Sequence, residues 1–284
     1  MDYNNAIDIT TNHYKKLGKH INRIFRGTDP GAIHEFRVEY KKLRAFLRMI
    51  SEQPGIENEI TVSKELKKFY TISGSIRDLQ LQQKRIEDAT VSEPKKPQAY
   101  LHLLQKEIEK IKPELAEIIS GKPVNKSKKK TDASIPAEFP FHFQQYVEKK
   151  WSAINAILLS GDFSDENIHA IRKILKDLFY NLKIADDPGK QNPANNIWNG
   201  KNDEWMNKFL EELGSFQDKC TSIALLKSYW IIGLNKYNQE LLTGLKKSWI
   251  REKLSLKQLL IKKMKIELLQ KKSTATNLAF DKNH

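Results

Sequence analysis

Apolar residues recur along most of the chain at the three- and four-residue intervals of an α-helix, and no stretch alternates apolar and polar residues as a strand does. Glycine and proline punctuate this pattern and predict where helices begin and end. We predict eight helices, at residues 5–25, 29–51, 57–88, 97–119, 138–160, 165–186, 205–242 and 245–272. The pattern therefore indicates an all-α protein.

The fourth and fifth predicted helices are separated by a segment of different composition. Residues 121–137 contain five lysines, two prolines and one aspartate, which is typical of a linker. We therefore divide the chain into a first half at residues 1–120, a linker at 121–137, a second half at 138–272 and a frayed tail at 273–284. Residues 188–200 are predicted to form a loop.

Two short motifs occur once in each half. The spacing I-H-x-x-R-x-x-x-K begins at Ile33 and again at Ile168, and G-S-x-x-D begins at Gly74 and again at Gly214. The two offsets are 135 and 140 residues, so the order and the approximate spacing are both repeated. We interpret this as an internal duplication, in which the two glycines allow close helix packing and the aspartates orient other groups.

The first of these motifs places basic side chains on one narrow face of a helix. At 100° per residue, the first such strip spans about 80° of the helical wheel, and its members are His34, Arg37, Lys41, Arg44 and Arg48. The corresponding second strip consists of His169, Arg172, Lys176 and Lys183, with Phe179 at the place of Arg44. Like charges at these spacings destabilise an isolated helix, so the arrangement is typical of a binding site for a polymer of phosphates.

Composition agrees with an anionic partner. The formal net charge is +14, and the flanking halves carry most of it. Nucleic acid, an anionic membrane surface and a phosphate polymer all suit such a charge. The competing interpretation is a basic helix face that is simply solvated.

Motifs for catalysis are missing from the sequence. It contains no phosphate-binding glycine loop, no zinc-protease motif and no nucleophile elbow, and the single cysteine, Cys220, suits a core position. We expect no enzymatic activity, no cofactor and no metal site. The first residues do not resemble a signal peptide, and no apolar run is long enough to span a membrane, so we expect a cytoplasmic protein.

Residues 33–44, which read I-H-E-F-R-V-E-Y-K-K-L-R, resemble the signature helix of the CHAD (conserved histidine α-helical domain) family, and residues 168–180 resemble its second signature helix. This resemblance implies two four-helix bundles related by a pseudo-twofold axis, with a basic cavity between them that binds inorganic polyphosphate, and it suggests association with polyphosphate granules. The ligands that it implies are His34, Arg37, Lys41, Lys42, Arg44, His169, Arg172, Lys173 and Lys176. Asp177 and Phe179 depart from the family, which is usually basic at both positions.

Three alternatives remain open. A nucleic-acid-binding protein would need aromatic residues for base stacking, for which Phe179 is the candidate. An enzyme acting on phosphates would need metal-binding carboxylates beside the strips. A helical scaffold for acidic proteins would use the lysines of residues 126–130.

Overall fold

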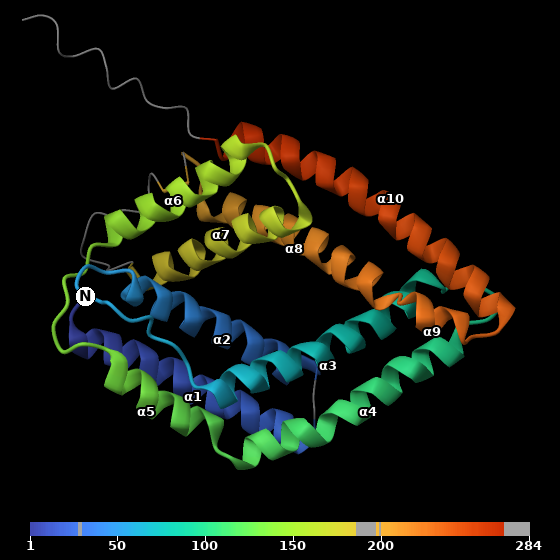
Figure 1. Cartoon of the computed structure of the whole chain (residues 1–284), viewed down its shortest axis with the longest axis horizontal. Helices are drawn as coiled ribbons and strands as arrows, with labels where there is room; N and C mark the ends of the chain where they lie inside the picture. The colour runs from blue at the N-terminus through green and yellow to red at the C-terminus, as the bar shows by residue number, and fades with distance from the viewer. Residues whose placement is uncertain (28–29, 186–196, 199, 270–284) are drawn as a thin grey trace, which may run out of the picture.

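The computed structural model describes residues 1–27, 30–185, 197–198 and 200–269, and every regular element among them is helical (Figure 1). The prediction of an all-α protein is therefore confirmed. The helices are α1 (Tyr3–Gly27), α2 (Pro30–Ser51), α3 (Lys64–Ala89), α4 (Gln98–Ser120), α5 (Pro123–Ser134), α6 (Phe143–Ser160), α7 (Asp165–Ala185), α8 (Asp203–Leu225), α9 (Ser228–Ile232) and α10 (Lys236–Glu267). Within the described ranges, no helix is long and apolar enough to cross a membrane.

Two predicted helix boundaries differ most from the structure. The helix expected from residue 57 begins at Lys64, where the Ser63 hydroxyl accepts a hydrogen bond from the Leu66 N–H and caps it. The last two predicted helices were expected to be separated at residues 243–244, but the break falls earlier, between α8 and α10. Asn235 caps the start of α10, and Gly244 lies inside this helix. The tail and most of the loop at 188–200 lie outside the described residues.

The segment predicted to be a linker contains α5. Proline occupies its first turn, where a missing N–H costs nothing. Pro123, Ser127 and Thr131 form its buried face, and the Tyr14 hydroxyl of α1 lies 3.0 Å from Ser127 Oγ. This buried face is small and mostly polar, so the spacing of apolar residues does not reveal the helix. The lysines of the segment lie on its other faces, as is typical of an exposed surface.

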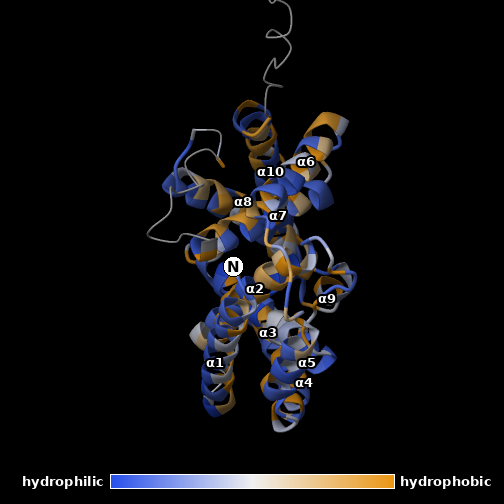
Figure 2. Cartoon of the chain, turned by 90° about the vertical axis from the view of Figure 1, so that its left-hand side faces the viewer, coloured by the Kyte–Doolittle hydropathy of each residue, from blue (hydrophilic) through white to orange (hydrophobic). Residues whose placement is uncertain are grey.

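The helices that carry the two basic strips pack against each other. In Figures 1 and 2, α7 lies above α2, and α1 and α5 lie below it. Phe36 and Leu43 of α2 and Leu175 of α7 are fully buried and place these helices in the core. Strips that are far apart in the sequence are thereby brought to one interface.

Candidate anion-binding site

Two lysines from different halves mark the centre of the site. Lys41 of α2 and Lys176 of α7 are half-buried, and neither forms an ion pair with a described carboxylate. Burial, together with the charges of Arg37 and Arg172, lowers the pKa of Lys41 to about 8. Burial and the charge of Arg172 lower the pKa of Lys176 to about 8 as well. The positive charges of Lys41 and Lys176 also oppose each other. The carboxylates of Asp78 and Glu211 offset only part of this repulsion, and neither pairs directly with Lys41 or Lys176. The group is therefore arranged to receive a further anion from outside.

Two arginines flank these lysines, and each lies against a glycine. Arg37 Nη1 donates a hydrogen bond of 2.8 Å to the Tyr70 carbonyl oxygen, and its Cζ lies 4.4 Å from the Tyr70 ring centroid. A Cβ atom at Gly74 would be only 2.8 Å from that Cζ, and one at Gly214 would be 3.2 Å from Arg172 Nη2. Each repeated glycine therefore makes room for a repeated arginine.

The two histidines lie beside these cations. Burial lowers the pKa of His34, and the charges of Arg77 and Lys41 lower it further. Burial likewise lowers the pKa of His169, with Arg172 and Lys173 adding to the effect. Nδ1 of His169 is buried with no hydrogen-bond partner among the described residues. Both rings are therefore mostly neutral at pH 7 in the ligand-free protein and offer hydrogen bonds rather than full charges.

The other predicted ligands lie at the edges of this group. Lys42 is half-buried and Lys173 is exposed, both adjacent in sequence to residues of the strips. Arg44 lies 5.8 Å from the Tyr40 ring centroid, and the exposed Lys183 lies 4.6 Å from that of Phe179.

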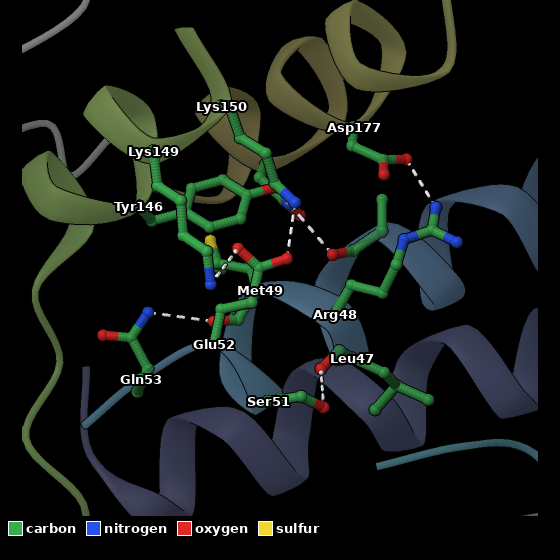
Figure 3. A network of polar contacts seen from close by, with 12 residues as sticks. Leu47, Arg48, Met49, Ser51, Glu52, Gln53, Tyr146, Lys149, Lys150 and Asp177 are labelled. Atoms are coloured by element: carbon green, nitrogen blue, oxygen red, sulfur yellow. Dashed lines mark hydrogen bonds and ion pairs between the residues drawn. The ribbon is translucent and has the colours of Figure 1, made fainter. Parts of the chain in front are cut away.

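Arg48 is bound within the protein. Its Nη2 donates a hydrogen bond of 2.6 Å to Asp177 Oδ1, which joins α2 to α7 (Figure 3). Directly after the end of α2, Glu52 pairs with Lys149 and Lys150 of α6. Asp177, noted in the sequence as a departure from the basic pattern, thus neutralises the last cation of the first strip and ties the two halves together.

We expect Asp177→Asn to lower the free energy of unfolding by about 1 kcal/mol, because a charge-assisted hydrogen bond to the partly exposed Arg48 is lost. Urea unfolding followed by circular dichroism measures this. Glu240→Gln on α10 removes one exposed carboxylate that forms no ion pair among the described residues, and it serves as the control. An unchanged midpoint in Asp177→Asn would show that the Arg48 pair does not stabilise the interface.

Arg77 of α3 is a cation near the site that the sequence analysis missed. Its charge reaches both His34 and Arg37, and its Nε is buried without a hydrogen-bond partner in the described part of the chain. The sequence did contain a clue to Arg77, because this residue lies inside the first G-S-x-x-D motif. The second motif has Gln217 at the corresponding place. Nearby, Arg85 pairs with Asp218 at 3.1 Å.

Fold and site together define an all-helical protein in which two cation-bearing helices, distant in sequence, face each other. The sequence model of the CHAD domain matches residues 8–227, and the chain belongs to the CHAD domain family. The predicted resemblance is therefore confirmed. The fold is similar to that of the crystal structure of the CHAD domain from the plant Ricinus communis, with a TM-score of 0.60 and 15% identity over 94% of this chain and 89% of that one. No curated protein matches the chain.

Proposed function

We propose that the protein is a non-enzymatic, cytoplasmic module that binds inorganic polyphosphate between α2 and α7. The observation that carries this proposal is the grouping of Lys41, Lys176, Arg37 and Arg172 at one interface without a carboxylate that pairs with either lysine. Guanidinium groups bind phosphate oxygens with two parallel hydrogen bonds, and lysines add mobile charge. Each ligated phosphate would relieve the repulsion among these cations.

A polymer suits the site better than a single small anion. The part of the first strip not paired within the protein runs over about 15 Å of helix, from His34 to Arg44. Arg77 extends the cationic surface from α2 onto α3, and Lys173 and Lys183 extend it along α7. Successive phosphates of one chain would contact successive cations, and such binding weakens steeply as salt increases.

The aromatic residues favour polyphosphate over nucleic acid. Phe179, the stacking candidate, is only 8% exposed and packs in the core. The Tyr70 ring is already covered by Tyr40, whose centroid lies 4.1 Å away, and by the Arg37 guanidinium. Because these faces are occupied, they are poor platforms for bases.

The test is calorimetric titration with long-chain polyphosphate and, separately, with single-stranded DNA of equal charge. We expect polyphosphate to bind more tightly than DNA, and His34→Ala/Arg37→Ala/Lys41→Ala to lose about tenfold or more of that affinity, because several charge-assisted contacts disappear. The matched control is Lys106→Ala/Lys110→Ala, which removes two exposed lysines from α4. Equal binding of both polymers, unchanged in the triple variant, would leave only nonspecific attraction to polyanions.

A further inference from the structure

A second basic region lies away from α2 and α7. Between α1 and α5 is a hollow of about 610 Å³, and its polar lining includes Lys15, Lys122 and Lys128. Thr11, Asn22 and Asn125 add neutral polar groups that can donate hydrogen bonds. No carboxylate lines this hollow, although Asp132 pairs with Lys128 from one turn further along α5. Lys15 and Lys122 form no ion pair with any described residue.

Two other hollows show that this charge pattern is not general. A hollow of about 480 Å³ at α3 and α8 contains Asp88 and Asp218 beside its cations. Another, of about 540 Å³, contains Asp78 and Glu107. The space between α1 and α5 differs from both because its charged lining is entirely positive. It is thus suited to an anion, and the other two are not.

The backbone at Lys122 is a further unusual feature. This residue has a φ of 51° and is the one non-glycine residue with positive φ in the described part of the chain. The left-handed conformation at the end of a helix is the place where glycine is most favourable. Gly121 directly precedes it with an ordinary φ of −73°, so the glycine is not at the position that needs it. A lysine held in this conformation suggests that its side chain has a use there.

The position of the hollow separates it from the first site. Helix α5 packs on α1 and α3, and in both views it lies on the opposite side of α2 from α7 (Figures 1 and 2). A short anion could therefore occupy one site without reaching the other. A long chain could contact one site on each of two protein molecules.

We propose that the hollow between α1 and α5 is a second binding site for phosphate polymers, so that one protein molecule holds two segments of polyphosphate and cross-links long chains. The proposal rests on the proposed function only for the identity of the polymer. It gives a role to the lysine-rich segment, which does not contribute to the interface of α2 and α7.

The first experiment is titration with tripolyphosphate, which is too short to bridge the two sites. We expect two bound molecules per protein, and one in Lys15→Gln/Lys122→Gly. Because glycine relieves the left-handed backbone, this variant should melt at the same temperature as the wild type or higher, which separates lost binding from lost folding. Lys106→Gln/Lys110→Gln removes two exposed lysines from α4 and should keep both sites.

The second experiment is light scattering with long-chain polyphosphate. The wild type should form large particles, whereas Lys15→Gln/Lys122→Gly should bind the polymer without forming them. The triple variant His34→Ala/Arg37→Ala/Lys41→Ala should still bind one tripolyphosphate, and adding the Lys15 and Lys122 changes to it should abolish this binding. That result would support the second site even if the interface of α2 and α7 binds no phosphate. A stoichiometry and a particle size that do not change in Lys15→Gln/Lys122→Gly would overturn the proposal.

Discussion

Polyphosphate is expected to bind about a hundredfold more weakly at pH 9.5 than at pH 7. Without a bound anion, Lys41 and Lys176 have pKa values of about 8, since both are partly buried among cations. A bound phosphate chain supplies the missing negative charge and returns these pKa values toward the ordinary 10.5. Binding therefore takes up protons above pH 8, and the affinity falls as the two amines lose their protons in the free protein.

Titrations at a series of pH values and constant salt measure this effect. Calorimetry in two buffers of different ionisation enthalpy gives the number of protons taken up. Lys41→Met/Lys176→Met should bind more weakly at pH 7 and should lose most of the pH dependence, whereas Lys42→Met should keep it. Tight binding with no proton uptake at pH 8.5 would show that these two lysines do not contact the polymer.

The same two lysines affect the stability of the empty protein in the opposite direction. Because their folded pKa values lie below the unfolded value of 10.5, the unfolded chain binds more protons between about pH 8 and pH 10.5. Their contribution to the free energy of unfolding therefore rises with pH across this window. Between pH 8 and 9.5, the protein should bind polyphosphate less well while these residues destabilise it less.

Gly74→Ala is expected to weaken polyphosphate binding about tenfold while changing the free energy of unfolding by less than about 1 kcal/mol. The new Cβ would overlap the Arg37 guanidinium, which is the flexible end of a side chain and can move. Moving it breaks the hydrogen bond to the Tyr70 carbonyl and takes the charge out of the site. Alanine stabilises a helix interior relative to glycine, which offsets the loss of these contacts.

Gly214→Ala is the matched control, because its Cβ would lie 3.2 Å from Arg172 Nη2 and a small shift accommodates it. We expect its affinity to fall by only about threefold, as for a contact that is weakened and not lost. Arg37→Ala/Gly74→Ala should bind no more weakly than Arg37→Ala alone, since both changes act through one guanidinium. Independent, additive effects would mean that Gly74 has a different role. Calorimetry of the four variants measures all of these affinities.

The sequence determined the fold class and the elements of the site because both depend on local periodicity. Apolar spacing predicted the helices. The motif at Ile33 and Ile168 placed His34, Arg37 and Lys41 on one face of a helix, and His169, Arg172 and Lys176 on the corresponding face of another. The family could be predicted because its signature is a short continuous helix. These inferences required no knowledge of which helices are neighbours in space.

The tertiary structure decided which side chains meet, because a helical wheel gives the direction of a side chain but not its partner. Arg48 is on the same strip as Lys41, yet it pairs with Asp177 because α7 brings a carboxylate to that end of α2. Packing also explains why Gly74 and Gly214 are glycines, because a side chain there would collide with Arg37 or crowd Arg172. Helix α5 escaped prediction because Ser127 and Thr131 bury polar groups whose partners, Tyr14 and the Ser63 N–H, are distant in the sequence. Sequence alone thus located the charges, and packing determined which of them are left without a partner.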